Sequence, residues 1–288
     1  MIPQAFINEW QQFAPWSSEA QVEQDLVLSR AIIEIFSHPL LANKLAFRGG
    51  TALHKLFIQP AARYSEDIDL VQITEGPIGP ILEALRAQLN PWLGEPRWKS
   101  NKGRATLVYR FDSESQPVTP MRLKVEINTR EHFAVLGIAK KEFEIKSLWF
   151  SQQTMITTFH LEELLATKLR ALYQRKKGRD LFDLVVILKK FPKLDINKML
   201  QSFHQYMSFD QTKVSRAEFE ANLAEKLNDT AFVNDIFPLL PINPIALKNS
   251  INPSEHNIDF YSPINDVIHV QERIISQLPG ESWKGKIT

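Results

Sequence analysis

The sequence predicts an α+β protein in which a mixed domain containing a β-sheet is followed by a helical domain. Two observations support this fold class. Runs of alternating apolar and polar residues, typical of half-buried strands, occur before about residue 150, whereas apolar residues at helical spacing dominate after it. Because 288 residues suffice for one large or two ordinary domains, we expect a first domain over 1–150 and a second over 151–288.

The elements of the first domain follow from its periodicity and its helix-breaking residues. Apolar residues recur at helical spacing up to about residue 45, with an interruption at Pro39. The elements expected after that point, in chain order, are a strand over 45–48, a helix over 51–58, a strand over 67–73, a helix over 81–90, and strands over 104–112 and 121–128. We expect the helix over 81–90 to end before Pro91, because proline lacks the backbone N–H that a helix interior needs.

The second domain is predicted to be helical. The apolar spacing indicates helices over 160–176, 180–191, 196–208 and 216–228. The stretch from about Pro238 is rich in proline, asparagine and isoleucine and predicts no particular element.

Composition narrows the class of protein. The chain is 44% hydrophobic and 23% charged, as expected for a globular protein, and its net charge of +1 provides no overall basic field for nucleic acid. The absence of cysteine excludes disulfides, thiolate metal sites and cysteine nucleophiles. The first residues lack signal-peptide features, and no run approaches the ~20 apolar residues of a membrane span. We therefore expect a cytoplasmic protein without membrane association.

The strongest chemical signal is an Asp-x-Asp at the start of the strand predicted over 67–73. Alternate residues of a strand point to the same side, so Asp67 and Asp69 share one face while Ile68 and Leu70 are buried on the other. Neighbouring carboxylates raise each other's pKa unless a cation neutralises them. Mg²⁺, which prefers oxygen ligands completed by substrate phosphates, meets that need. The alternative is a pair of solvent-facing carboxylates at a strand end.

A glycine pair precedes this strand. Gly49, Gly50 and Thr51 lie where the first predicted strand meets a helix. Without a Cβ the backbone approaches a phosphate closely, and the helix N-terminus directs N–H groups and a positive dipole end at it. Arg48 and Ser65 flank these motifs as further nucleotide contacts, although Ser65 also suits a turn cap. Together with the aspartates, these residues predict a metal-dependent site for phosphoryl or nucleotidyl transfer.

Glu126 is the candidate third carboxylate. On the strand predicted over 121–128 it shares the polar face with Arg122, Lys124 and Asn128. If that strand lies beside the Asp67 strand, Glu126 completes the metal cluster or deprotonates an attacking hydroxyl. Otherwise it is a solvent-facing glutamate paired with a lysine.

Lys168 interrupts an apolar stripe. At about 100° per residue, Leu164, Leu165, Leu169 and Leu172 form one face of the helix over 160–176, and Lys168 falls near its middle. Burying an ammonium there is costly, so the side chain either extends to the edge of the stripe or meets an anion such as a nucleotide phosphate.

A cluster of cations follows Lys168 in an otherwise neutral chain: Arg170, Arg175, Lys176, Lys177 and Arg179. The cluster either forms a solvated helix end, where cations suit the dipole, or contacts a triphosphate or an RNA backbone. We assign Arg175 to nucleotide binding. Asp180 follows in the first turn of the next helix, on its inward face, and either caps that helix or orients Lys168 or an arginine.

In this order, four motifs resemble the AbiEii/AbiGii family of nucleotidyltransferase toxins, the toxin half of bacterial abortive-infection toxin–antitoxin systems. The motifs are Phe47 to Leu53, Arg63 to Leu70, Leu164 to Leu172 with Lys168, and Arg179 to Leu184. The four-part pattern is specific, although each part alone is weak. Its glycine motif is Gly-Gly-Thr rather than the Gly-Ser of many polymerase-β-like enzymes, which agrees with this family.

The resemblance implies a polymerase-β-like nucleotidyltransferase domain followed by a helical domain. It also implies an NTP as nucleotide donor, Mg²⁺ held by Asp67 and Asp69, Lys168 near the phosphates, and an acid at Asp180 or Asp183. The family is similar to transferases that modify tRNA 3′ ends and is usually encoded beside an antitoxin. The implied partners are therefore tRNA or another RNA acceptor and a cognate antitoxin, with a role in phage defence. Glu126 as a third metal carboxylate rests on strand-face geometry alone.

Two other interpretations stay open. A catalytically degenerate fold would serve as a binding module for RNA or a partner protein, although the intact Asp-x-Asp argues against this. An active enzyme would otherwise transfer a nucleotide to a protein side chain or a small molecule. A steep salt dependence is expected of RNA binding and not of small-molecule transfer.

Overall fold

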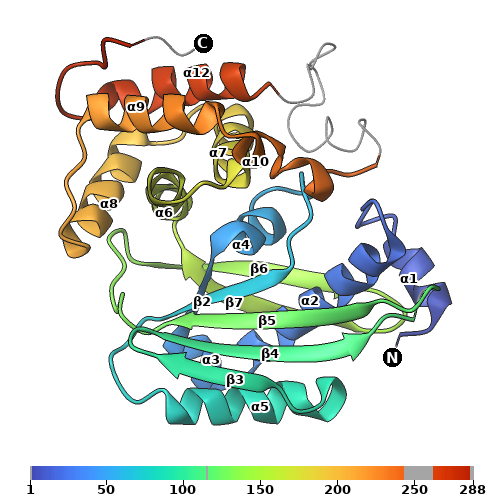
Figure 1. The fold of residues 1–288 in the computed structure, drawn as a ribbon. Helices are drawn as coiled ribbons and strands as arrows, with labels where there is room; N and C mark the ends of the chain where they lie inside the picture. The colour runs from blue at the N-terminus through green and yellow to red at the C-terminus, as the bar shows by residue number, and fades with distance from the viewer. Residues whose placement is uncertain (1, 115, 243–261, 286–288) are drawn as a thin grey trace.

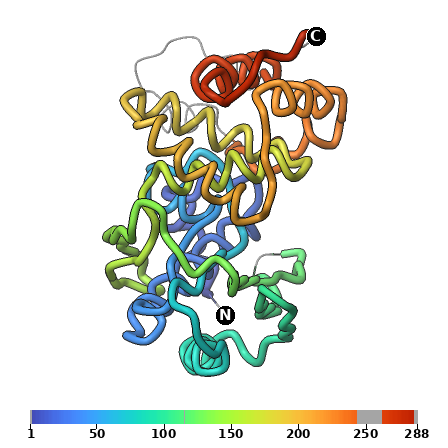
Figure 2. The backbone as a smooth tube through the Cα atoms, turned by 90° about the vertical axis from the view of Figure 1, so that its left-hand side faces the viewer, coloured from blue at the N-terminus to red at the C-terminus, as the bar shows by residue number. Residues whose placement is uncertain are grey.

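The protein consists of a sheet-containing part and a stack of helices, as Figures 1 and 2 show from two directions. This computed structural model describes residues 2–114, 116–242 and 262–285. The strands are β1 (Leu45–Arg48), β2 (Asp67–Gln72), β3 (Arg97–Asn101), β4 (Arg104–Asp112), β5 (Pro120–Asn128), β6 (Ile138–Lys146) and β7 (Ser151–Phe159). The helices of the sheet-containing part are α1 (Gln4–Trp10), α2 (Glu19–Ser37), α3 (Pro39–Lys44), α4 (Gly49–Leu56) and α5 (Gly79–Leu93). The later helices are α6 (Leu161–Gln174), α7 (Gly178–Lys190), α8 (Ile196–Phe209), α9 (Arg216–Leu227), α10 (Thr230–Asn234) and α12 (Pro263–Arg273).

The strands form one mixed sheet in the order β3-β4-β5-β2-β1-β7-β6. Strand β2 runs parallel to β5, and β1 runs parallel to β7, while the other neighbours are antiparallel. The β2–β5 register sets Asp67 opposite Lys124 and Asp69 opposite Glu126. The sheet therefore brings together charged residues about sixty positions apart in the chain.

Two hydrophobic cores hold the structure together. The first lies between the sheet and helices α1, α2, α3 and α5, and it buries the apolar face that alternation predicts for β4 and β5. The second joins α4 and the opposite side of β1 and β2 to helices α6 to α9 and α12. On that opposite side, β3, β4 and β5 present polar residues that neither core covers. This exposed side of β3, β4 and β5 is called the open sheet face below.

The expected strands at 45–48, 67–73, 104–112 and 121–128 and the four later helices are confirmed to within a few residues. The end predicted for the helix over 81–90 is wrong, because α5 continues through Pro91 to Leu93. Leu93 is buried, and Gly94, with a φ of +76°, ends the helix instead. Burial of one more apolar residue thus outweighs the backbone hydrogen bond lost at proline.

Three strands escaped prediction because their sequences lack a repeating apolar face. All of β3 is exposed, only Phe143 and Ile145 of β6 are buried, and the first half of β7 is polar. Pairing with neighbouring strands fixes these segments despite weak local preference. Since β7 belongs to the sheet, the boundary expected near residue 150 falls between two of its strands. We propose that the second domain begins at His160, the residue before α6; residues 243–261 and 286–288 of that domain lie outside the described ranges.

Among the residues that the structure describes, none of the helices combines the length and apolarity needed to cross a bilayer.

Candidate active site

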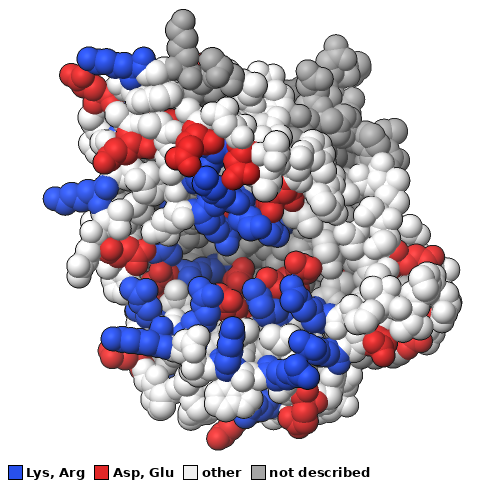
Figure 3. Space-filling model, in the orientation of Figure 1, with Lys and Arg blue, Asp and Glu red and all other residues white. Residues whose placement is uncertain are grey.

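A cleft of about 710 Å³ separates the open sheet face from α6 and α7. Figure 3 shows two groups of blue side chains on either side of a hollow, with red side chains between them. The cations that line the cleft are Arg48, Arg63, Arg104, Arg122, Lys124, Arg130, Lys168, Arg170, Arg175 and Arg179. The carboxylates that line it are Glu66, Asp67, Asp69, Glu126, Glu131 and Asp210. An enclosed site that concentrates cations around a few carboxylates suits a polyanionic ligand.

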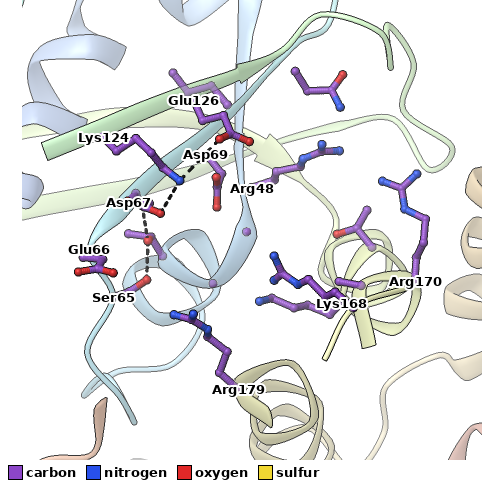
Figure 4. A pocket seen from close by; sticks show the side chains of 18 of the residues that line it. Arg48, Ser65, Glu66, Asp67, Asp69, Lys124, Glu126, Lys168, Arg170 and Arg179 are labelled. Atoms are coloured by element: carbon purple, nitrogen blue, oxygen red, sulfur yellow. Dashed lines mark hydrogen bonds and ion pairs between the residues drawn. The ribbon is translucent and has the colours of Figure 1, made fainter. Parts of the chain in front are cut away.

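The three carboxylates expected to act together lie on the same face of adjacent strands. Asp67 and Asp69 project from β2, and Glu126 projects from the register position opposite Asp69 on β5. Lys124 lies among them, as Figure 4 shows: its Nζ is 2.8 Å from Asp67 Oδ2 and 3.6 Å from Glu126 Oε2. Arg104 Nε approaches Glu126 at 3.3 Å. The sheet thus confirms the predicted adjacency and adds Lys124, which strand-face reasoning had placed beside Glu126 but not against Asp67.

The carboxylate group is electrostatically unbalanced at Asp69. Burial raises the pKa of Asp69, and the charges of Asp67 and Glu126 raise it further, against weaker opposition from Lys124 and Arg48. Partial burial alone would lower the pKa of Lys124, but its contacts with Asp67, Glu126 and Asp69 raise it. Asp69 therefore lies where an additional cation would stabilise the folded protein.

The donor set suits Mg²⁺, although no preassembled metal site is present in the described residues. No group of three or more His, Cys, Asp or Glu side chains is gathered there as a metal cage. Carboxylate oxygens are nevertheless the donors that Mg²⁺ prefers, and Mg²⁺ commonly takes its other ligands from substrate phosphates and water. Asp67 and Asp69, with Glu126 nearby, fit such an ion if Lys124, whose side chain is 29% exposed, turns away from Asp67.

The glycine pair fixes the position of α4 against the carboxylates. Strand β1 ends at Arg48, and α4 begins at Gly49, which has a φ of +82°. A Cβ on Gly49 would lie 2.3 Å from Asp69 Oδ2, and one on Gly50 would lie 2.2 Å from Arg63 Nη2. The first-turn N–H groups of a helix have no acceptors within it, so they are available to a phosphate here.

Substituting Gly49 by alanine is expected to lower activity at least about 100-fold, because the added methyl group displaces Asp69. The left-handed backbone should also cost roughly 1–3 kcal/mol of stability. Initial rates and urea unfolding measure both effects. Gly79→Ala is the matched control, since a Cβ at Gly79 meets no atom within 4 Å and its backbone is not left-handed. Equal activities of the two variants would contradict this role for Gly49.

Thr51 and Ser65 join the two motifs to each other. Thr51 Oγ1 donates to the backbone oxygen of Asp67 at 2.5 Å and lies 2.6 Å from Ser65 Oγ. Both residues line the cleft, as expected of nucleotide contacts, and Figure 4 shows the pair below Asp67. Thr51 is almost fully buried. Their hydroxyls therefore tie the start of α4 to the start of β2 and hold the glycine pair beside the aspartates.

Lys168 and Arg175 meet at Asp180 on the opposite wall. Lys168 Nζ lies 3.0 Å from Asp180 Oδ1, and Arg175 donates to both oxygens of Asp180 at 2.7 and 2.9 Å. Burial alone would raise the pKa of Asp180, but Lys168 and Arg175 hold it below its usual range. The structure thus places Asp180 where it orients both Lys168 and an arginine. The anion that Lys168 meets is a protein carboxylate, and its side chain still lines the cleft.

A second buried carboxylate, Asp183, connects α7 to the rest of the site. Arg63 donates to both of its oxygens at 2.6 and 2.8 Å, Lys168 Nζ lies 2.8 Å away, and His54 Nε2 lies 2.9 Å away. Burial opposes the charge, but Arg63 and Lys168 hold the pKa of Asp183 well below its usual range. Arg63 is 3% exposed and so reaches Asp183 rather than a ligand. This network locks α4, α6 and α7 together behind the cleft.

His54 makes the network sensitive to acid. Its Nδ1 accepts from the Ala62 N–H, so Nε2 carries the proton given to Asp183 in the neutral ring. Burial lowers the pKa of His54 to about 4, although Asp183 opposes this. In the unfolded chain histidine titrates near 6.5, so the unfolded state binds more protons below that pH, and stability is lost as the pH falls from 6.5 to 4.

We expect this loss to approach about 3 kcal/mol. Urea unfolding of the wild type and of His54→Gln between pH 7 and 4.5 measures it, because glutamine keeps an N–H donor and does not titrate. The wild type should lose more stability than the variant across this window. Parallel pH profiles would contradict the assignment.

The remaining cations of the cleft form further pairs at its other end. Arg48 and Arg170 both bind Glu131, Arg170 also binds Asp210 at 3.2 Å, and Arg130 lies 3.7 Å from Asp210. Burial alone would raise the pKa of Glu131, but Arg48 and Arg170 hold it below its usual range. This chain connects β1, the segment after β5, α6 and the end of α8 across the cleft.

The cation cluster predicted after Lys168 divides in two. Arg170, Arg175 and Arg179 line the cleft, whereas Lys176 and Lys177 pair with carboxylates of the helical domain outside it. Sequence reasoning did not find Glu131, Asp210 or the bridging role of Asp183. Their types and spacing carry no local signal, because each acts through a partner from a distant element.

Comparison with known proteins places the chain in a recognised group. A family model described as the nucleotidyl transferase AbiEii toxin of type IV toxin–antitoxin systems matches residues 30–252. No curated protein sequence gives a significant match.

Two solved structures are similar in fold. MenT4, a nucleotidyltransferase toxin from Mycobacterium tuberculosis H37Rv, has a TM-score of 0.59 and 15% identity over 90% of this chain and 92% of its own. An antigenic nucleotidyltransferase-like protein from Paracoccidioides brasiliensis has a TM-score of 0.36 and 18% identity over 73% and 96% of the chains. The first match confirms the expected nucleotidyltransferase fold.

Proposed function

Because the chain belongs to the AbiEii family of nucleotidyltransferase toxins from type IV toxin–antitoxin systems, it is a nucleotidyltransferase, and we propose the reaction in detail. We propose that it transfers a nucleoside monophosphate from an NTP to an RNA, with the tRNA 3′ end as the favoured acceptor. The reaction depends on Mg²⁺ and occurs in the cytoplasm. A cognate antitoxin controls it.

One observation carries this proposal: a carboxylate wall and a cation wall face each other across a cleft into which a glycine-initiated helix points. Asp67, Asp69 and Glu126 form the first wall, and Lys168 and Arg175 belong to the second. A triphosphate brings several negative charges that the second wall and the N-terminus of α4 stabilise. The carboxylates require a cation, and Mg²⁺ bound to Asp67 and Asp69 would supply charge neutralisation at the phosphates.

The chemistry is an in-line displacement at the α-phosphorus. The acceptor hydroxyl oxygen bonds to that phosphorus, the bond to the oxygen bridging the β-phosphate breaks, and pyrophosphate leaves. We assign the hydroxyl proton to Glu126, which lies on the open sheet face with its side chain 22% exposed. Lys168, held by Asp180 and Asp183, and Arg175 stabilise the charge that develops on the leaving pyrophosphate.

An RNA acceptor is supported by the charge outside the carboxylate group. Arg104 is exposed, and Arg122 is exposed and has no ion pair among the described residues, so both are available to a phosphate backbone. Small uncharged acceptors would gain nothing from these side chains.

The test is incubation of the purified protein with Mg²⁺ and each α-³²P-labelled NTP, in parallel with total bacterial tRNA or with bacterial protein extract. We expect label on tRNA with one preferred NTP, with a rate that falls steeply as salt increases. Label on protein, or transfer independent of salt, would contradict the RNA acceptor. NTP binding without any transfer would contradict the enzyme assignment.

A further inference from the structure

A second cavity opens beside the active-site cleft. It has a volume of about 670 Å³ and lies between the start of α2 and the adjoining ends of β4 and β5. Glu66 and Arg122 line both the cavity and the cleft. Glu66 directly precedes Asp67, and Figure 4 shows it at the edge of the catalytic residues. A ligand that fills the second cavity therefore extends directly to the carboxylates.

Two arginines face each other in this cavity. Arg110 on β4 is the register partner of Arg122 on β5, and both are exposed. Like charges directly opposite each other destabilise a sheet. Glu66 and Asp112 also line the cavity, yet neither arginine forms an ion pair with any residue that the structure describes. The pair thus lacks a protein counter-charge and matches an anionic ligand such as a phosphodiester.

The cavity also presents a buried acceptor and ring surfaces. The Gln24 side chain is 4% exposed, and its Nε2 donates to the Arg122 backbone oxygen at 2.8 Å. That bond leaves Gln24 Oε1 buried without a hydrogen-bond partner. Leaving such an acceptor unsatisfied costs stability, so a ligand N–H at this position would be favourable. Tyr64 and Phe111 add aromatic surface of the kind on which nucleobases stack.

We propose that this cavity binds the terminal nucleotide of the RNA acceptor, with Arg110 and Arg122 on its phosphate and Gln24 Oε1 accepting from a base N–H. The inference rests on the proposed function and specifies where its acceptor lies. It places the acceptor on the β4–β5 side of the carboxylates, opposite the Lys168 wall where the triphosphate binds. An acceptor hydroxyl then approaches Asp67, Asp69 and Glu126 through the passage beside Glu66.

The experiment compares two double variants that remove the same charge. Arg110→Gln with Arg122→Gln changes the cavity, while Arg97→Gln with Lys99→Gln changes exposed residues of β3 that line neither cavity nor cleft. For the first pair we expect the KM for total bacterial tRNA to rise at least about tenfold, with the KM for NTP unchanged. Its salt dependence, the slope of log K against log salt, should fall by about 0.7 for each lost contact. The control pair should keep wild-type values.

Equal losses in both pairs would overturn the proposal, since that result means diffuse attraction rather than a subsite. A raised KM for NTP in the first pair would overturn it as well. Filter binding of the same tRNA without NTP separates this proposal from the proposed function. Binding that depends on Arg110 and Arg122 without label transfer supports the cavity and contradicts the RNA transferase; transfer that is indifferent to both arginines does the reverse.

Discussion

Replacing Asp69 by asparagine is expected to lower the rate of nucleotidyl transfer at least about 1,000-fold while the protein stays folded. The substitution keeps the shape of the side chain and removes one of three neighbouring carboxylates. Since burial and the charges of Asp67 and Glu126 both raise the pKa of Asp69, its negative charge is unfavourable in the folded protein without a bound cation. We therefore expect the melting temperature to stay the same or rise.

Transfer rates at saturating NTP and thermal unfolding in the absence of Mg²⁺ measure these two effects. Glu75→Gln is the matched control, because Glu75 is exposed just beyond β2 and lines neither wall of the cleft. A variant at Asp69 that keeps activity within tenfold of the wild type would rule out its role in the reaction. A large loss of stability instead would assign Asp69 to the fold.

Replacing Asp183 by asparagine is expected to cost about 3–5 kcal/mol of unfolding free energy, the largest stability effect in the molecule. The carboxylate is fully buried and neutralises Arg63 and Lys168, which are themselves 3% and 5% exposed. Without it, Arg63 remains buried against an amide. Activity should fall in parallel, because Asp183 also holds Lys168 at the cleft.

Urea unfolding at pH 7 measures the cost, and Glu225→Gln provides the control, since its ion pair with Lys176 is exposed and should contribute nothing measurable. The double variant Arg63→Met with Asp183→Leu tests the cause. It removes both charges, so it should recover part of the stability lost in Asp183→Asn. Failure to recover any would assign the loss to packing rather than to the uncompensated guanidinium.

The parts of the fold that the sequence predicts are those in which local pattern and tertiary burial agree. Strands β4 and β5 alternate because each buries one face, and helices α6 to α9 repeat apolar residues at helical spacing because each contributes to the second core. Strands β3, β6 and β7 bury few side chains or only part of their length, so their pairing leaves little trace in the sequence.

The candidate site follows the same division. Asp67, Asp69 and the glycine pair are predictable because period and local backbone geometry alone set their directions. The placement of Glu126 required the β2–β5 pairing, which strand patterns allow but do not determine. Asp183 was unpredictable as a centre, because its partners Arg63 and His54 lie more than a hundred residues away and carry no shared local signal.

The most direct test of the central claim is the intact mass of a purified tRNA before and after incubation with the enzyme, Mg²⁺ and the preferred NTP, with pyrophosphate measured in the same sample. The account predicts that each tRNA molecule gains whole nucleoside monophosphate residues and that one pyrophosphate appears for each residue gained. Asp69→Asn should produce neither change. An unchanged tRNA mass, or a gain without matching pyrophosphate, would contradict the account.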